Sequence, residues 1–221
     1  MNKDNIRKMG YIVLHKLLLK IKEYNKDKLK DNSYILCPNH TSDFDGPVLW
    51  TSNNNIRIMA KKELFKNKLM AKFLNKMDVV SVDRSKHSAR EIMQAVRYLK
   101  EGSEHKVFML FPQGTISDIN KNALARIKEG AFVISALSKT PIVPVFIEQP
   151  RIFRRSRIVY GNQLSLDILD EKEKIDRKKL LDARLIWQQE IFRLQQEAIE
   201  LENRPIRKIK LSKKHANNNQ G

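Results

Sequence analysis

Residues that build special architectures are scarce in this sequence. Its 221 residues include one cysteine, Cys37, which excludes an intrachain disulfide and a cysteine-rich zinc site. Only seven glycines and seven prolines are present, which excludes a collagen-like or low-complexity chain. A lone cysteine fits a reducing compartment, so a cytoplasmic location is the expectation.

Long apolar runs are absent from the beginning of the chain as well. The longest run within residues 1–30 extends from Tyr11 to Leu14, which is too short to span a bilayer or to form the apolar part of a signal peptide. The whole chain is 41% apolar and 31% charged, which excludes a wholly disordered chain and a polytopic membrane protein. The length suits one domain with an ordinary core.

Acidic residues are too few to balance the basic ones, especially at the two ends. The formal net charge is +18, of which residues 1–30 carry +6 and residues 204–221 carry another +6. Basic ends attract polyanions, so nucleic acid and anionic lipid surfaces are both candidate partners. For residues 204–221 alone we predict a solvated, disordered tail.

Residues 1–30 contain an amphipathic pattern with helical spacing. Its apolar positions, separated by Lys and Arg, are Ile6, Met9, Ile12, Val13, Leu17, Leu18 and Ile21. A basic amphipathic helix of this kind can lie flat in the headgroup region of an anionic membrane. Packing against the protein's own core uses the same pattern, so a membrane-surface anchor and a core helix both stay open.

The middle of the chain alternates between short apolar runs and segments of helical periodicity. The runs, which we interpret as buried strands, are 34–37, 56–60, 78–82, 106–111, 142–147 and 157–160. The helical segments are 61–76, 88–100, 123–138 and 170–203. Strands that alternate with helices of this length need crossover connections. We therefore predict one α/β domain over 31–203, with a mostly parallel sheet flanked by helices and a long C-terminal helical segment.

Polar residues that could carry chemistry follow three of the predicted strands. His40 and Asp45 follow the first, Arg84 follows the third, and the turn Gln113-Gly114-Thr115 follows the fourth. Because the carboxyl ends of parallel strands share one edge of a sheet, we expect these residues to converge there.

His40 is the candidate for proton transfer. An imidazole suits this role near neutral pH, and a carboxylate on its second nitrogen fixes the tautomer. Asp43 and Asp45 are both candidates for that carboxylate. In the alternative interpretation, one of these aspartates caps a helix that begins near Gly46, and His40 is an ordinary loop histidine.

The other candidates favour an anionic ligand. Arg84 has a planar, permanently charged fork that can bind phosphate through two hydrogen bonds, although a surface pair with Asp83 would use the same residue. Gly114 lets backbone N–H groups approach a ligand closely, although a plain strand-to-helix connection would look alike. Cys37 lies within an apolar strand and is predicted to be buried filler. Metal-ligand spacing and glycine-rich nucleotide loops do not occur.

Four ordered segments resemble those of the glycerolipid acyltransferases, the family that includes 1-acylglycerol-3-phosphate acyltransferase. NHTSDFDGP is similar to the HxxxxD motif of that family. The other segments are AKKELF at 60–65 with VDRS at 82–85, FPQGTIS at 111–117 with IKEGA at 127–131, and PIVPV at 141–145.

The resemblance implies direct acyl transfer without a covalent enzyme intermediate, and the residues themselves predict no cofactor and no metal. His40 would deprotonate the acceptor hydroxyl, and Asp45 would orient His40. The donor would be acyl coenzyme A, an acyl carrier protein thioester or an acyl phosphate. The acceptor would be a lysophospholipid, with 1-acylglycerol-3-phosphate converted to phosphatidic acid. The implied substrate-binding residues are Lys61, Arg84, Gln113, Gly114, Thr115 and Lys128.

The third motif departs from the family pattern FPEGTR. Gln113 replaces the glutamate, which keeps a hydrogen-bonding carbonyl but loses the charge, and Ile116 replaces the arginine, which removes a phosphate donor. Because His40 and Asp45 are both present, the departure bears on the acceptor more than on the chemistry.

Two other classes of function stay open. One is a catalytically degenerate member that binds lipid. The other is a basic nucleic-acid-binding protein, although no RNA-binding sheet motif, zinc finger or helix-turn-helix signature occurs. For the acyltransferase, the basic start favours peripheral attachment to the cytoplasmic face of an anionic membrane, without a specific nucleic acid partner.

Overall fold

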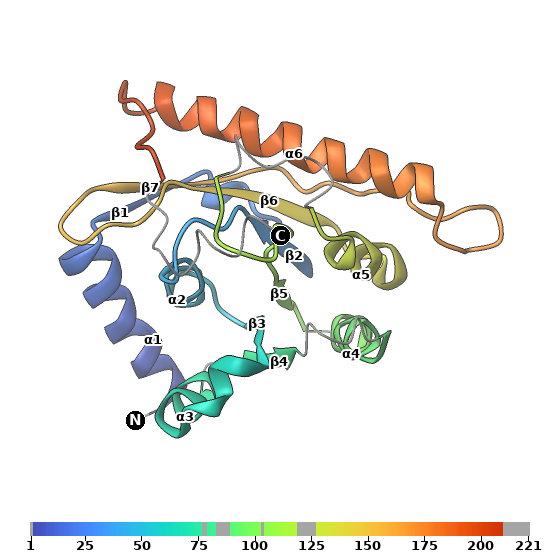
Figure 1. The fold of residues 1–221 in the computed structure, drawn as a ribbon, viewed down its shortest axis with the longest axis horizontal. Helices are drawn as coiled ribbons and strands as arrows, with labels where there is room; N and C mark the ends of the chain where they lie inside the picture. Colours follow the sequence, from blue (N-terminus) through green and yellow to red (C-terminus); the bar gives the residue numbers. More distant parts are fainter. Residues whose placement is uncertain (1, 77–78, 83–88, 103, 119–126, 210–221) are drawn as a thin grey trace.

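A seven-stranded sheet forms the centre of the protein (Figure 1), with the strand order β1-β7-β6-β2-β5-β3-β4. The computed structural model describes residues 2–76, 79–82, 89–102, 104–118 and 127–209. The strands are β1 (Ile21–Tyr24), β2 (Tyr34–Pro38), β3 (Ile56–Lys61), β4 (Val79–Val82), β5 (Val107–Met109), β6 (Ile142–Ile147) and β7 (Ser156–Tyr160).

Neighbouring strands run parallel except for β6 and β7. Residues 148–155 join β6 directly to β7, so the chain reverses without a crossover helix and this pair is antiparallel. β2 lies between β5 and β6, and all of its residues are buried. The carboxyl ends of β2, β5 and β6 therefore lie at one edge of the sheet.

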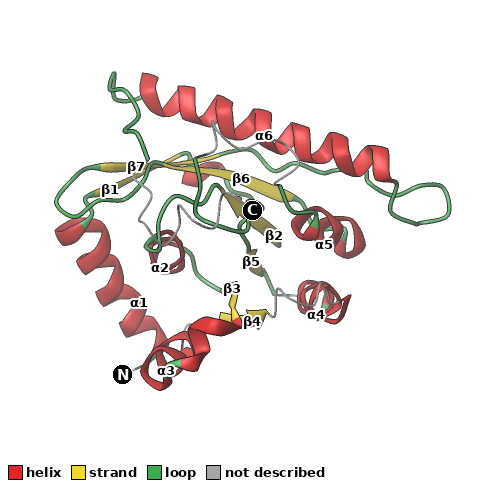
Figure 2. Ribbon diagram, in the orientation of Figure 1, coloured by secondary structure: helices red, strands yellow, loops and turns green. Residues whose placement is uncertain are grey.

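Helices cover both faces of the sheet (Figure 2). α4 (Ala89–Lys100), α5 (Gly130–Ser138) and α6 (Arg177–Glu200) contribute to one hydrophobic cluster. α2 (Asp45–Ser52) and α3 (Lys68–Lys76) contribute to the other. None of the described helices is both long and apolar enough to cross a bilayer.

The predicted fold class is confirmed: the chain forms one α/β domain with a mostly parallel sheet and a long C-terminal helix. All six predicted strands are present, with ends shifted by at most two residues. The segment 61–76 divides into a short 3₁₀ helix, η3 (Lys62–Lys66), and α3. In the segment 123–138, α5 begins at Gly130, and residues 119–126 lie outside the described part.

The single helix predicted within residues 1–30 is wrong in its second half. α1 (Lys3–Tyr11) continues into a π-helix, η1 (Ile12–Leu18), and Lys20 then takes a left-handed backbone conformation with φ 44°. The chain next forms β1, which pairs with β7 at the edge of the sheet, and the 3₁₀ helix η2 (Lys26–Lys28). Ile21 continues the helical spacing, so the local pattern predicts a helix here. The strand β1 forms instead because it pairs with β7, which is far away in the sequence.

The N-terminal segment packs on α2 with one face and leaves an apolar face exposed. Its buried side includes His15, whose Nε2 lies 3.1 Å from the carbonyl oxygen of Val48 and 3.1 Å from the hydroxyl of Thr51. Burial lowers the pKa of His15 below its ordinary value. The exposed side carries Met9, Ile12, Val13 and Leu17. Packing against the protein's own core therefore accounts for the buried face of this segment, but it does not account for the exposed apolar face.

The predicted disorder over 204–221 is wrong for its first part. Arg204 lies 3.0 Å from a carboxylate oxygen of Glu148, and the backbone N–H of Arg207 donates to the same carboxylate over 3.2 Å. Glu148 is buried directly after β6, and nothing local in the sequence relates it to residues far along the chain. Residues 210–221 lie outside the described part.

Candidate active site

The loop between β2 and α2 holds His40 against Asp45. His40 Nδ1 lies 3.0 Å from Asp45 Oδ2, and the two side chains are 17% and 0% exposed. Since a carboxylate only accepts hydrogen bonds, Nδ1 carries a proton and donates a hydrogen bond to Asp45. Within the described part of the chain, Nε2 of the same ring makes no hydrogen bond. The ring is thus oriented from one side, and its other nitrogen is available.

Asp45 also shapes the loop that carries the histidine. Its Oδ2 accepts hydrogen bonds from the backbone N–H groups of Thr41 over 2.6 Å and Ser42 over 2.9 Å. The helix α2 begins after Phe44, which makes no side-chain cap, and Asp43 is exposed. The interpretation of either aspartate as a simple helix cap is therefore wrong, and Asp45 is the partner of His40.

The turn after β5 braces the backbone of His40. Gln113 Oε1 accepts from the His40 N–H over 2.6 Å, and Gln113 Nε2 donates to the Ser117 hydroxyl over 2.8 Å. The Ser117 N–H in turn donates to the His40 carbonyl oxygen over 3.0 Å. Gly114, at φ 70°, closes the turn with an N–H bond of 2.9 Å to the Phe111 carbonyl oxygen. Both polar ends of the Gln113 side chain thus bind protein groups.

The aromatic ring of Phe111 packs against the imidazole of His40. Phe111 stacks on the His40 ring with centroids 4.0 Å apart and planes 18° from parallel. Sequence reasoning missed Phe111 and Ser117, although both stand within the FPQGTIS segment. Ile116, where the family pattern has arginine, is buried and presents no donor.

The remaining predicted residues lie near this edge or outside the described part. Lys61 is the last residue of β3, whose carboxyl end lies at the same edge. Lys128 donates its N–H to the Pro112 carbonyl oxygen over 2.7 Å, and its side chain is exposed. Thr115 is half-buried, and its carbonyl oxygen accepts from Ser117 over 3.2 Å. Arg84 falls outside the described residues.

Two amide side chains connect the His40 loop to the end of β6. Asn39 exchanges hydrogen bonds with the backbone of Ile147, over 3.0 Å as donor and 2.6 Å as acceptor. Gln149 Nε2 donates to the Thr41 carbonyl oxygen over 2.9 Å. The segment that follows β6 is therefore a direct neighbour of the site.

Glu148 is a second buried carboxylate at the same edge. It receives hydrogen bonds from Arg157 over 2.9 Å and from both terminal nitrogens of Arg204 over 3.1 and 3.0 Å. Burial raises its pKa, but the bonds from Arg157 and Arg204 outweigh that effect and hold the pKa below its ordinary value. Sequence reasoning missed this residue, although an acid directly after an apolar strand and close to several arginines was a signal.

The thiol of Cys37, the one cysteine of the sequence, is not accessible to a substrate. Cys37 is fully buried, and burial raises the pKa of its thiol far above the ordinary range, as expected for buried filler. The described residues contain no group of three His, Cys, Asp or Glu side chains placed to hold a metal ion.

Comparisons with known proteins agree with this geometry. The family model named Acyltransferase matches residues 20–148. A 1-acyl-sn-glycerol-3-phosphate acyltransferase of Bacillus subtilis is 32% identical over 133 residues, which cover 59% of this chain and 63% of that protein. The enzyme of the same name from Streptococcus pneumoniae is 29% identical over 162 residues, covering 69% of this chain and 58% of that protein.

A solved structure shares the fold. The 1-acyl-sn-glycerophosphate (LPA) acyltransferase PlsC from Thermotoga maritima superposes with a TM-score of 0.58 at 20% identity, covering 87% of this chain and 78% of that one. The matched part of this chain spans less than two thirds of the length of the Bacillus and Streptococcus relatives.

Proposed function

The chain belongs to the Acyltransferase family, and from that premise we propose that it transfers a fatty acyl group to the hydroxyl of a lysophospholipid. The donor is an acyl thioester, of coenzyme A or acyl carrier protein, or an acyl phosphate. The acceptor is 1-acylglycerol-3-phosphate, the substrate in the names of the Bacillus and Streptococcus relatives, and the product is phosphatidic acid.

The contact between His40 and Asp45 carries this proposal. With Nδ1–H bonded to Asp45, Nε2 of His40 holds the lone pair that can take the proton of the acceptor hydroxyl. The hydroxyl oxygen then attacks the acyl carbonyl carbon, and the carbon–sulfur or carbon–oxygen bond to the leaving group breaks. The buried Asp45 carboxylate stabilises the imidazolium, which returns its proton to the leaving thiolate or phosphate.

Cationic residues within the family segments support a phosphate-bearing acceptor. Lys61 and Lys128 lie within the segments AKKELF and IKEGA, and Arg84 follows β4 in the sequence. In the proposal these three residues hold the acceptor phosphate, and the turn at Gly114 and Thr115 borders the same space. Permanent or near-permanent positive charge is suited to that task.

The exposed apolar face of the N-terminal segment supports attachment to a membrane. Ile12 and Leu17 are 55% and 60% exposed, and lysines lie between the apolar positions. In the proposal this face rests in the headgroup region of the cytoplasmic leaflet, where both the acceptor and the product reside.

Flotation with vesicles of phosphatidylcholine and phosphatidylglycerol tests the attachment. The double variant Ile12→Ser, Leu17→Ser should float less than the wild type. The matched control is Leu181→Ser, Leu185→Ser on α6, which removes two large apolar side chains that are 42% and 37% exposed. Equal loss in both variants would contradict a specific N-terminal contact.

A panel of donors and acceptors tests the activity. Purified protein would receive labelled acyl coenzyme A, acyl carrier protein thioester or acyl phosphate, each with lysophosphatidate, lysophosphatidylcholine or glycerol 3-phosphate. We expect transfer to lysophosphatidate to be fastest with at least one donor. The absence of transfer from every donor to every acceptor would contradict the proposal and favour a degenerate lipid-binding protein, with Gln113 and Ile116 as the first substitutions to revert.

A further inference from the structure

The hairpin between β6 and β7 exposes two large apolar side chains at its tip. Arg151 and Arg154 form an antiparallel bridge, and the two residues between them are Ile152, 54% exposed, and Phe153, 67% exposed. Phe153 has φ 58°, a left-handed conformation that glycine or asparagine adopts more readily. The left-handed backbone and the exposed ring are two separate costs, and the exposure of the ring points to a partner that takes it up.

The tip lies beside the apolar face of the N-terminal segment. The N–H of Phe153 donates to the carbonyl oxygen of Leu18 over 2.6 Å. Figure 1 shows the loop between β6 and β7 next to the start of β1, at the left edge of the molecule. Ile152 and Phe153 therefore lie near the end of the segment that carries the exposed side chains of Met9, Ile12, Val13 and Leu17.

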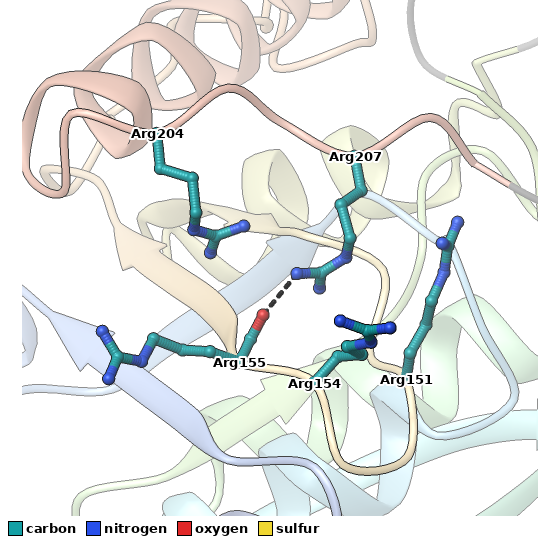
Figure 3. Close-up of a pocket in the computed structure, with 5 residues that line it drawn as sticks. All are labelled: Arg151, Arg154, Arg155, Arg204 and Arg207. Carbon is teal, nitrogen blue, oxygen red and sulfur yellow. Dashed lines mark hydrogen bonds between the residues drawn. The ribbon is translucent and has the colours of Figure 1, made fainter.

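Behind the tip, five arginines line a pocket of about 350 Å³ (Figure 3). Arg151, Arg154 and Arg155 come from the hairpin, and Arg204 and Arg207 come from the segment after α6. The guanidinium group of Arg207 holds the two segments together through bonds to the carbonyl oxygens of Gln149, over 3.0 Å, and Arg155. Bonds to Glu148 and to the hairpin backbone thus fix Arg204 and Arg207, and the exposed side chains of Arg154 and Arg155 complete the lining of the pocket.

Positive charge exceeds negative charge around this pocket. Among the described residues, the carboxylates that pair with its arginines are Glu148 and Glu202, and Glu148 is also bound to the buried Arg157. Arg207 Nε is buried and has no hydrogen-bond partner in the described part. The side chain of Arg154 likewise makes no hydrogen bond or ion pair there. Unused N–H donors and surplus charge suit a phosphate group.

We propose that this hairpin is a membrane-binding element in which the arginine pocket binds the phosphate of an anionic phospholipid headgroup. Ile152 and Phe153 then enter the acyl layer beside that headgroup. The apolar tip is adjacent in sequence to arginines on both sides, which places charge at the phosphate level when the tip is submerged. The inference deepens the peripheral attachment in the proposed function and assigns it a second contact with a defined ligand chemistry.

A tryptophan at the tip reports its insertion. The two native tryptophans, Trp50 and Trp187, are 2% and 0% exposed, so the emission of a Phe153→Trp variant will dominate any response to vesicles. We expect a blue shift with vesicles that contain phosphatidylglycerol and none with phosphatidylcholine alone. Unchanged emission with anionic vesicles, under conditions where the protein floats with them, would overturn insertion of the tip.

Removal of two pocket charges tests the headgroup site. Arg154→Gln, Arg155→Gln should weaken binding to anionic vesicles by about 30-fold, since each basic residue near a charged surface contributes about 1 kcal/mol. The control Arg97→Gln, Lys100→Gln on α4 removes the same charge from exposed positions elsewhere and should change binding by less than about 3-fold. An equal loss in both variants would reduce the effect to net charge and overturn the site.

Soluble ligands separate a lipid headgroup from free phosphate. Binding of dihexanoyl phosphatidate and of inorganic phosphate would be followed through the arginine Nε–Hε resonances, including that of Arg207. Saturable shifts with the short-chain lipid at concentrations at least 10-fold lower than with phosphate are expected. Equal responses to dihexanoyl phosphatidate and to phosphate would overturn the assignment of a lipid ligand. The absence of any response would overturn the pocket as a binding site. None of the three readouts, tryptophan emission, vesicle binding or arginine resonances, involves acyl transfer, so each stands even where the activity assay fails.

Discussion

Asp45 and Glu148 are both fully buried carboxylates at the same edge of the sheet, but they have opposite surroundings. Asp45 meets one imidazole, the hydroxyl of Thr41 and two backbone N–H groups, and no arginine or lysine contacts it in the described part of the chain. Glu148 meets the guanidinium groups of Arg157, Arg204 and Arg207.

The difference lies in what each partner can do with its proton. An imidazole gains and loses a proton near neutral pH, so the carboxylate beside it can support proton transfer. A guanidinium keeps its proton, so a carboxylate among three of them serves to fix the chain. Glu148 thus fastens the segment after α6 to β6 and β7, and the arginines it leaves unneutralised face the pocket.

Among the variants that keep His40, replacement of Asp45 should produce the largest loss in activity. Asp45→Asn preserves the shape of the side chain but presents an amide where the His40 Nδ1–H and two backbone N–H groups donate. We expect kcat to fall by about 10²- to 10⁴-fold, because the imidazole loses its tautomer and its counterion. Asp43→Asn is the matched control at an exposed neighbour and should keep nearly full activity. A similar loss in both variants would contradict the assignment.

Replacement of Glu148 should act on stability. Glu148→Gln leaves the fully buried Arg157 without its carboxylate, and we expect the free energy of unfolding to fall by about 3–5 kcal/mol in urea titrations. Because the pKa of Glu148 lies below its ordinary value, its contribution is present above about pH 4.3 and is lost as the pH falls through the folded-state pKa.

The control for Glu148 is an ion pair whose carboxylate is exposed. Glu129 lies 3.3 Å from Arg184 and is 57% exposed, so Glu129→Gln should cost less than about 1 kcal/mol. A cost for Glu148→Gln no greater than that of the control would show that the arginines do not need this carboxylate.

Gln113 should have a smaller effect, exerted through the backbone of His40. Gln113→Ala removes the acceptor of the His40 N–H and should lower kcat on the order of 10-fold, because a displaced base meets the acceptor hydroxyl less often. Gln113→Glu keeps that acceptor, and the Ser117 hydroxyl can donate to it, so most of the activity should remain. Steady-state kinetics on both variants would check this, and full activity in Gln113→Ala would contradict the bracing role.

His15 should produce the smallest effect, a pH dependence of stability. Its pKa is lowered by burial, so between the folded-state pKa and the unfolded value of about 6.5 the unfolded chain binds more protons. Stability should therefore be complete above about pH 6.5 and decrease as the pH falls below it. Thermal unfolding from pH 7.5 to 5.5 would reveal a slope that His15→Asn reduces. If His15→Asn showed the same slope of stability against pH as the wild type, the pH dependence would come from other titratable groups.

The sequence predicted those parts of the structure that local patterns encode. Continuous apolar runs indicated six strands, and the position of His40 and Asp45 directly after one of them indicated the site. The sequence did not predict β1, because this strand depends on its pairing with Ser156 and the residues after it, which are far away in the sequence. The choice of Asp45 over Asp43 required the actual path of the loop.

The arginine cluster could not be predicted for a similar reason. Arg204 and Arg207 resemble any basic tail until Glu148, more than fifty residues earlier in the chain, is seen to bind them. Gln113 was expected to contact substrate, whereas its side chain binds the His40 backbone and Ser117. In each case a hydrogen bond between residues far apart in the sequence determines the position of the side chain, and local spacing cannot predict such a bond.

The most direct test of the central claim is the rate of acyl transfer to lysophosphatidate by His40→Ala, with His105→Ala as the control. His105 lies at the other end of the sheet beside Tyr34, so its loss removes an imidazole without touching the site. The account predicts that a folded His40→Ala protein loses about 10³-fold or more in kcat while the control stays active. A folded His40→Ala protein that keeps more than about a tenth of the wild-type rate would contradict the role of His40 as the base.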